Sequence, residues 1–167
     1  ILFSMDAEKA HHLVLDNLCH SKKWASAILN LDRKPTHLRR TLAGMTIDSP
    51  IGLAAGLDKD GVAIPVWPQL GFGFIEVGTV TAHPQTGNPK PRLFRLKEER
   101  GLINRMGFNN LGSEALATNI RTLREQGLWP DNSNTPIGAN IGKSKITPLE
   151  EAGEDYRISM ERLQGLI

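Results

Sequence analysis

The stretch Gly-Leu-Ala-Ala-Gly-Leu-Asp-Lys-Asp-Gly at residues 52–61 combines residue types that can bind a cofactor. The apolar residues 51–54 predict a short buried strand, and Ala55 and Gly56 then leave the backbone open to a flat or phosphorylated ligand. Lys59 adds a positive charge with three hydrogen-bond donors directly after the turn. The alternative is an ordinary βα turn with a surface lysine, because glycine-rich turns are common.

Two later segments repeat this arrangement of a strand followed by polar residues. Residues 73–79 form an apolar run ending in Gly-Thr, and residues 137–143 form another ending in Asn, Gly and Lys. In a barrel of parallel strands, the carboxyl ends of the strands form the active face. The three segments therefore predict an α/β fold with its site at that end.

Helices are expected between and after these strands. Leu116, Ile120 and Leu123 predict an amphipathic helix over residues 113–126. Residues 147–150 read as a capping box, which predicts a helix that begins near Pro148 and is still running at the end of the chain. One face of this second helix is expected to carry Leu149, Ala152, Tyr156, Met160, Leu163 and Ile167.

The connecting segments are less regular. Pro65 and Pro68 predict only a short or kinked helix after residue 60. Residues 41–51 predict a hairpin that leads into the first barrel strand, and residues 92–96 and 101–104 predict a pair of antiparallel strands.

Residues 1–44 differ in character and are expected to form a separate helical unit before a barrel at 45–167. Asp6 can cap a helix whose shared face is Ala10, Leu13, Val14 and Leu18, and residues 24–29 begin a second apolar cluster. Between His20 and Arg40, a single acid, Asp32, accompanies six basic residues: Lys22, Lys23, Arg33, Lys34, Arg39 and Arg40. This composition is typical of a segment that lies on an anionic membrane, and the alternative is a helical pair packed on the barrel with a solvated charged rim.

Composition excludes several classes of protein. The formal charge is +2 with 23% charged residues, so we expect no nucleic-acid partner. The single cysteine, Cys19, excludes a disulfide scaffold, and no apolar run approaches the ~18 residues that span a bilayer. We expect no metal site.

Four motifs together resemble one family. They are residues 52–61, the strand 74–81, the run Gly-Asn-Pro-Lys-Pro-Arg-Leu-Phe-Arg-Leu at 87–96, and Ile-Asn-Arg-Met-Gly-Phe-Asn-Asn at 103–110. The chain closely resembles dihydroorotate dehydrogenases of the quinone-dependent, membrane-associated class (class 2), in register from about Asp6 to the end. The N-terminal extension disfavours the soluble class, which uses fumarate or a nicotinamide chain.

The resemblance implies the N-terminal part of an FMN-containing (β/α)8 TIM barrel preceded by a small helical extension. It implies oxidation of dihydroorotate to orotate in pyrimidine synthesis, with electron transfer to a quinone. The residues implied to contact FMN are Ala55, Gly56, Leu57, Asp58, Lys59, Thr79 and Asn140.

The resemblance also implies a substrate pocket and a quinone tunnel. Lys59 and the segment Asn104, Arg105, Met106, Gly107 and Phe108 are implied to bind orotate, a planar anion. The alternative for Asn104 is a turn-forming residue. His11 and Arg95 are implied to line the quinone tunnel, although His11 could be a packing residue and Arg95 could pair with Glu98 or Glu99.

One expected part of the family's site does not occur. The serine base lies in an Asn-x-Ser-Ser-Pro-Asn segment in quinone-linked members, and this sequence has no such segment. Because a full barrel needs roughly 250 residues, we expect a fragment whose base lies beyond Ile167 and whose parent binds peripherally to the bacterial cytoplasmic or mitochondrial inner membrane. The alternative is a noncatalytic, membrane- and quinone-contacting helical module on an incomplete barrel.

Overall fold

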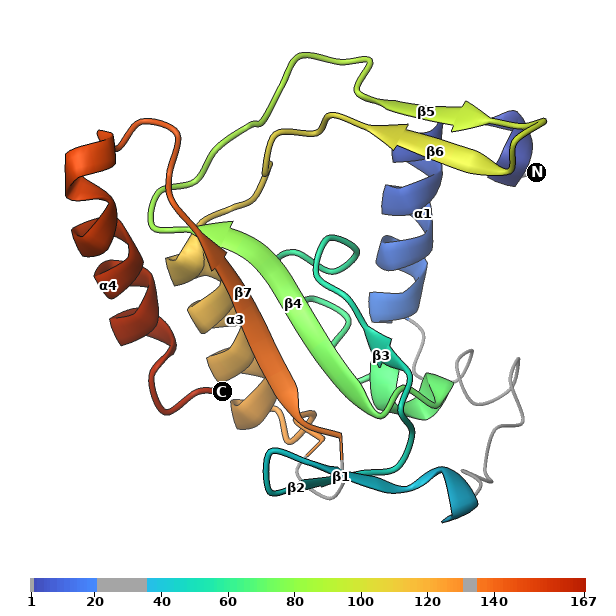
Figure 1. Cartoon of the computed structure of the whole chain (residues 1–167), viewed down its shortest axis with the longest axis vertical. Helices are drawn as coiled ribbons and strands as arrows, with labels where there is room; N and C mark the ends of the chain where they lie inside the picture. The colour runs from blue at the N-terminus through green and yellow to red at the C-terminus, as the bar shows by residue number, and fades with distance from the viewer. Residues whose placement is uncertain (1, 21–35, 131–134) are drawn as a thin grey trace.

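A parallel three-stranded sheet forms the centre of the computed structural model, which describes residues 2–20, 36–130 and 135–167. Its strands are β3 (Gly52–Leu53), β4 (Phe74–Thr81) and β7 (Ile137–Gly142), in the order β3-β4-β7. Both pairings are parallel, so the three strands run in the same direction and the carboxyl ends of β4 and β7 lie side by side (Figure 1). The expected α/β architecture is therefore confirmed.

The central strand β4 separates an apolar face from a polar one. Ile75, Val77 and Val80 are almost completely buried in the core, because alternate residues of a strand point to the same face. Glu76 and Thr79 instead bond to Asn140 of β7. A register shift between Gly78 and Val80 lets Thr79 join the polar face.

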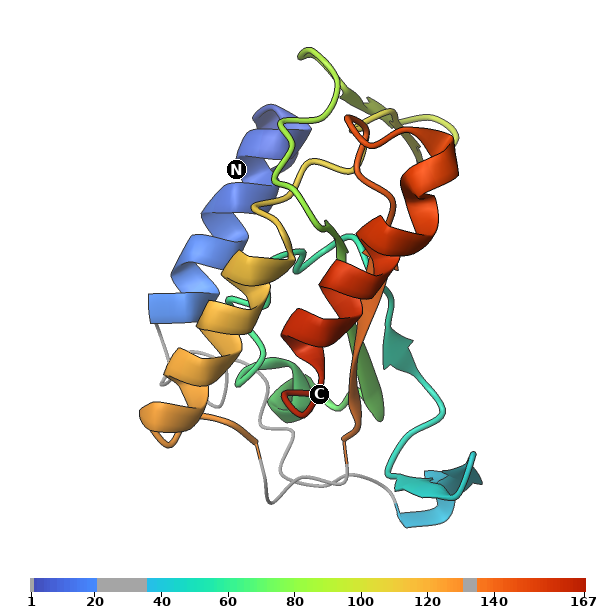
Figure 2. The same cartoon turned by 90° about the vertical axis from the view of Figure 1, so that its left-hand side faces the viewer.

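Helices α3 (Ser113–Glu125) and α4 (Ala152–Leu163) cover the apolar face. Figure 2 shows both helices on the same side of the sheet. The expected helix at 113–126 is confirmed, since Leu116 and Ile120 are fully buried and the chain turns at Gly127 with a positive φ of 62°.

The expected orientation of α4 is wrong. Its buried positions are Asp155, Ser159 and Leu163, whereas Leu149 and Met160 are 79% and 62% exposed. Asp155 accepts hydrogen bonds from Ser144 and Thr147 on the loop after β7, and these bonds turn a polar residue inward. The helix follows a short 3-10 turn, η4 (Leu149–Glu151), and ends at Leu163 rather than continuing.

Two antiparallel hairpins lie at opposite ends of the sheet (Figure 1). Strands β1 (Arg40–Leu42) and β2 (Met45–Ile47) pair below it, and β5 (Leu93–Leu96) and β6 (Gly101–Asn104) pair beyond its carboxyl edge. Both hairpins were expected. The short 3-10 helix η3 (Trp67–Leu70) also agrees with the prediction for the proline-containing segment.

Helix α1 (Ala7–His20) follows the short turn η1 (Leu2–Ser4) and packs against β5. Asp6 caps it as expected, because its Oδ1 accepts the Lys9 N–H at 3.0 Å. The expected apolar face is only partly correct: Ala10 is buried and Leu18 packs against the core, but Leu13 and Val14 are 42% and 38% exposed, and Glu8 and Leu15 are buried instead. The inward turn of Glu8 has a specific partner, described below.

The structure describes only part of the region for which a second apolar cluster and a basic segment were predicted. The apolar cluster at 24–29 and the basic residues at 22, 23, 33 and 34 lie outside the described residues. The short turn η2 (Thr36–Leu38) leads into β1, so the predicted boundary at residue 44 lies in the turn between β1 and β2. The division into two units stays a prediction.

Candidate functional site

The carboxyl edge of the sheet carries a small polar network. The Thr79 hydroxyl donates to Asn140 Oδ1 at 2.6 Å, and Asn140 Nδ2 donates to Glu76 Oε1 at 3.3 Å. A Cβ on Gly78 would lie 2.4 Å from the Asn140 carbonyl oxygen, so glycine is required for this close approach of β4 and β7. Thr79 and Asn140, predicted separately from two strands, are thus brought together.

Gly56 begins the turn after β3 and is tied to the same edge. Its N–H donates to the Gly78 carbonyl at 2.7 Å. Its φ is 114°, a conformation that favours glycine, and a Cβ built there would meet no atom within 4 Å. The backbone at Gly56 is therefore open on the side where a side chain would project.

Asp58 fixes the rest of the turn from within. Its buried carboxylate accepts hydrogen bonds from Val62 N, Ala63 N and Trp67 Nε1 at 2.8–2.9 Å. Burial raises the pKa of Asp58, and these three donors oppose that change. Asp58 therefore acts as an anchor that sets the position of the adjacent Lys59.

Lys59 differs from Asp58 in having no bonded partner among the described residues. Its side chain is half-buried, yet its ammonium makes no hydrogen bond or ion pair with any of the described residues. Burial is the main cause that lowers the pKa of Lys59, while the charge of Asp60 acts in the opposite direction. A half-buried cation without a partner is suited to bind an anionic ligand.

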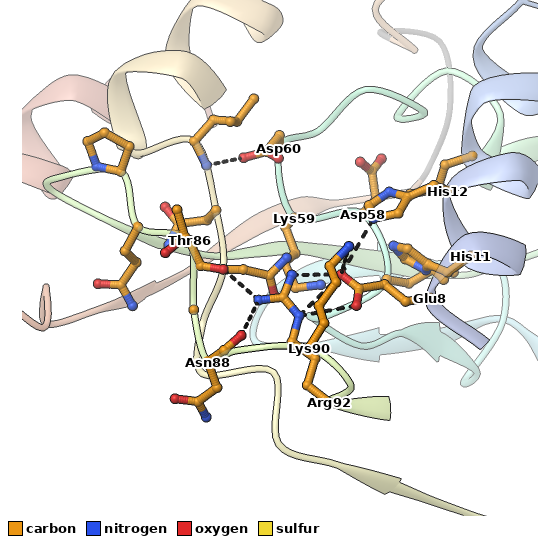
Figure 3. A pocket seen from close by; sticks show the side chains of 18 of the residues that line it. Glu8, His11, His12, Asp58, Lys59, Asp60, Thr86, Asn88, Lys90 and Arg92 are labelled. Atoms are coloured by element: carbon orange, nitrogen blue, oxygen red, sulfur yellow. Dashed lines mark hydrogen bonds and ion pairs between the residues drawn. The ribbon is translucent and has the colours of Figure 1, made fainter. Parts of the chain in front are cut away.

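A cavity of about 1000 Å³ lies between α1 and the loops around Lys59 (Figure 3). Its lining comes from α1 and from residues 57–62, 84–92 and 109–111. Of the predicted site residues, it collects His11, Leu57, Asp58 and Lys59. Ala55, Gly56, Thr79, Asn140, Arg95 and residues 104–108 do not line it.

The predicted substrate segment follows β6 as a tightly bonded loop. Asn104 Oδ1 accepts the Met106 N–H at 2.8 Å, which is the turn-forming role weighed above, and its Nδ2 makes no bond with the described residues. Arg105 Nη2 donates to the Pro91 carbonyl, Met106 is buried, and Phe108 is 60% exposed with a φ of 52°. Asn104 therefore shapes the turn through its Oδ1, and its Nδ2 group can donate a hydrogen bond to a ligand.

Of the two predicted tunnel residues, His11 lines the cavity and Arg95 does not. His11 is half-buried in the cavity, where burial is the main cause that lowers its pKa to about 4 and the charge of Lys59 adds to the effect. Arg95 donates to the carbonyls of Met5 and Leu2 and lies over the Phe3 ring rather than pairing with Glu98 or Glu99. Arg95 thus fastens the N-terminal turn to the hairpin.

Sequence reasoning missed two groups that hold the site together. One is the buried pair of Glu8 and Arg92, in which both residues are at most 6% exposed. The other is Asn110, whose side chain bonds to Thr81, to the Phe108 carbonyl and to Gly112 N. Arg92 and Asn110 both fall inside the motifs that carried the resemblance, but neither residue type indicates burial by itself.

A parallel sheet with a glycine-open turn and with amide and hydroxyl groups at its carboxyl edge is the arrangement of an α/β protein of the barrel type, a class in which ligand sites lie at that edge. The family model for dihydroorotate dehydrogenase matches residues 37–167, and the chain belongs to that family.

Curated relatives and solved structures agree with this family. The chain is 51% identical to "Dihydroorotate dehydrogenase (quinone)" of Chloroflexus aurantiacus, over 98% of the chain and 45% of the relative. It is 48% identical to the protein of the same name from Xylella fastidiosa, over 99% of the chain and 45% of the relative. The chain therefore spans about 45% of the length of these relatives.

Solved structures confirm the fold. A crystal structure of DHODH from Eimeria tenella in complex with ferulenol superposes with a TM-score of 0.83 at 36% identity. The superposition covers 95% of this chain and 41% of the Eimeria chain. The fold class expected for the N-terminal part of a (β/α)8 barrel is thus confirmed.

Proposed function

We propose that the enzyme containing this chain oxidises dihydroorotate to orotate with FMN and passes the electrons to a quinone. The observation that carries the proposal is Lys59, a half-buried cation that has no partner within residues 2–20, 36–130 and 135–167 and lies near the open backbone of Gly56. Family membership and the printed name of the relatives support the reaction and the electron acceptor.

The residues at the carboxyl edge fit the requirements of FMN. Ala55 and Gly56 allow a flat ring to approach the backbone, and the residues from Leu57 to Lys59 continue the same turn. Thr79 and Asn140 supply a hydroxyl and an amide from the neighbouring strands. When bound, FMN supplies a two-electron acceptor for dihydroorotate and a two-electron donor for the quinone.

The substrate is proposed to lie between Lys59 and the loop 104–108. Lys59 balances the negative charge of the orotate carboxylate, and the free Nδ2 of Asn104 donates to a carbonyl of the ring. Arg105, Met106, Gly107 and Phe108 shape the remainder of the pocket. The base that accepts a proton from dihydroorotate is proposed to lie in the part of the full-length enzyme that these 167 residues do not cover.

The quinone is proposed to reach the flavin past α1. The low pKa of His11 keeps its imidazole neutral at physiological pH, which suits contact with an uncharged quinone. Arg95 holds the turn at Leu2–Ser4 against β5 and so keeps α1 in place beside this route.

Peripheral attachment to the bacterial cytoplasmic or the mitochondrial inner membrane is part of the same proposal. Apolar residues such as Phe3, Leu13 and Val14 are exposed at and near α1 and offer surface for a lipid interface. Among the helices of residues 2–20, 36–130 and 135–167, none has the length and apolar content to cross a bilayer.

Separate measurement of the two half-reactions tests the proposal in the enzyme that includes these residues. The purified enzyme should show flavin absorbance that dihydroorotate bleaches anaerobically and a quinone restores. Arg95→Ala should impair reoxidation by quinone and leave bleaching almost intact. Equal loss in both half-reactions would assign Arg95 to the fold alone, and the absence of flavin or of bleaching in the unmodified enzyme would refute the proposed function.

The second candidate is a noncatalytic module, and the free edges of β3 and β7 in the described part of the chain favour it for these residues in isolation. Flavin content separates the two candidates. The 167 residues produced alone should contain no flavin, whereas the enzyme that also includes the remaining length of its relatives should contain it.

A further inference from the structure

A buried ion pair joins Glu8 of α1 to Arg92, the residue immediately before β5. Arg92 Nη2 lies 2.6 Å from Glu8 Oε1, and Arg92 Nε lies 3.2 Å from both carboxylate oxygens. Glu8 is 4% exposed and Arg92 is 6% exposed. This bidentate geometry fixes the guanidinium in one orientation (Figure 3).

The same guanidinium also holds the loop before β5. Arg92 Nη1 donates to the carbonyl of Thr86 at 2.5 Å and to that of Asn88 at 3.0 Å. Glu8 binds Nε and Nη2 and so fixes the orientation of the guanidinium. In this orientation Nη1 reaches the carbonyls of both Thr86 and Asn88. Glu8 therefore acts on residues 86–88 through Arg92.

That loop is interlocked with the predicted substrate segment. Asn88 N donates to the Met106 carbonyl at 2.9 Å, and Asn88 Nδ2 donates to the Arg105 carbonyl at 2.7 Å. A Cβ on Gly87 would lie 2.2 Å from the Met106 carbonyl oxygen, and one on Gly107 would lie 2.8 Å from the Asn88 side chain. Neither loop can shift without the other, because there is no room between them.

We propose that Glu8 and Arg92 are positioning residues: they transmit the docking of α1 through residues 86–88 to the substrate segment 104–108. This inference rests on the proposed function for its link to orotate. The helix proposed to form the quinone entrance then also sets the shape of the substrate pocket, although no residue of α1 would touch orotate.

The Glu8 carboxylate stays ionised, and the ion pair with Arg92 stays intact, over the physiological pH range. Hydrogen bonding from Arg92 is the main cause that lowers the pKa of Glu8 to about 2, against the opposing effect of burial. Lys90 Nζ lies 3.3 Å from Glu8 Oε1 and His12 Nε2 lies 3.8 Å from it, so the carboxylate faces only donors.

The test compares Glu8→Gln with Glu114→Gln in the holoenzyme. Both glutamates lie in the first turn of a helix and pair with an arginine, but Glu114 is exposed on α3 and bonds to Arg121 and Arg162. Glu8→Gln should raise the Kd of orotate and the KM for dihydroorotate about tenfold. Glu114→Gln should change none of these constants by more than twofold.

Amide hydrogen exchange gives a second readout that does not depend on orotate. Residues 86–88 and 104–108 should exchange faster in Glu8→Gln, whereas α3 and α4 should not change. Arg92→Lys should keep α1 docked through its charge and still release residues 86–88 and 104–108, because lysine cannot bond to Glu8 and to both carbonyls in this geometry.

The outcomes separate the inference from the proposed function. If unmodified enzyme does not bind orotate, the proposed function fails, and the exchange data alone decide whether the mechanical link exists. If orotate binds and both variants keep normal Kd and normal exchange at 104–108, the inference is overturned. Loss of flavin and equal loss of both half-reactions in both variants would also overturn it, since that pattern indicates a scaffold role only.

Discussion

Lys59 and the pair of Glu8 and Arg92 line the same cavity but differ in how their charges are satisfied. Arg92 uses its Nε, Nη1 and Nη2 groups for bonds to protein oxygens, and the Glu8 carboxylate lies beside two cations, Arg92 and Lys90. Lys59 is half-buried and has no such partner among the described residues. The difference shows that hydrogen-bond satisfaction, rather than charge or burial alone, distinguishes a structural group from a binding group.

Removal of Arg92 should have the largest effect on stability. Arg92→Ala leaves the Glu8 carboxylate buried without its main partner and should cost about 3–5 kcal/mol. Chemical denaturation of the enzyme should show this loss, and limited proteolysis should cut near α1. A matched Arg121→Ala change removes an exposed pair and should cost less than about 1 kcal/mol. If Arg92→Ala and Arg121→Ala lower the free energy of unfolding equally, the buried pair is no more important to stability than an exposed one.

Removal of Lys59, in contrast to removal of Arg92, should weaken ligand binding without lowering stability. Lys59→Ala should weaken orotate binding about 100-fold, or about 3 kcal/mol, because it deletes a charged donor, and should slow flavin reduction in stopped-flow measurements. The free energy of unfolding should not fall, since the ammonium stabilises nothing in the described structure. The control is Lys97→Ala, an exposed lysine between β5 and β6. Unchanged flavin reduction would refute the binding role.

Asn104 should fall between these two extremes, because it has one satisfied and one free group. Asn104→Ala should weaken orotate binding by about 1–3 kcal/mol and leave FMN content near normal. Asn104→Asp keeps the acceptor for Met106 N and removes the Nδ2 donor, so it should retain stability but not affinity. Loss of flavin or of the fold in Asn104→Ala would assign the residue to the turn alone.

The titration of His11 should give the smallest effect. Its pKa is lowered to about 4 by burial in the folded protein, so between pH 6.5 and pH 4 the unfolded chain binds a proton that the folded chain does not. The stability that depends on neutral His11 is present above pH 6.5 and is lost as the pH falls toward 4. NMR of the histidine ring protons should show one resonance with a pKa near 4 that disappears in His11→Gln. If the resonance that His11→Gln removes titrates near 6.5 instead, the burial of this side chain is contradicted.

The sequence predicted the elements whose signals are local. The strands at 74–81 and 137–142, the helix at 113–125 and both hairpins follow from periodicity and turn residues, and the paired Thr79 and Asn140 follow from polar residues at strand ends. The family resemblance is the source of the proposed cofactor and substrate, which stay proposals together with their binding residues.

The errors have one physical cause. The buried faces of α1 and α4 were predicted from apolar spacing, but Glu8 and Asp155 turn inward because distant residues satisfy them. Arg92 is 84 residues from Glu8, and Ser144 lies in a loop 11 residues before Asp155. Helical periodicity contains no information about such partners, so a polar residue that is buried and paired is assigned to the surface.

The spacing of Glu8 and Arg92 also sets an order of events during synthesis. Helix α1 is made first, and its glutamate has no arginine partner until the chain has grown by 84 residues. At roughly 5–20 residues per second, the interval is about 4–17 s. During that time α1 is an amphipathic helix without its anchor, exposed to chaperones or to a nearby bilayer, and the arrival of Arg92 decides when it becomes part of the folded enzyme.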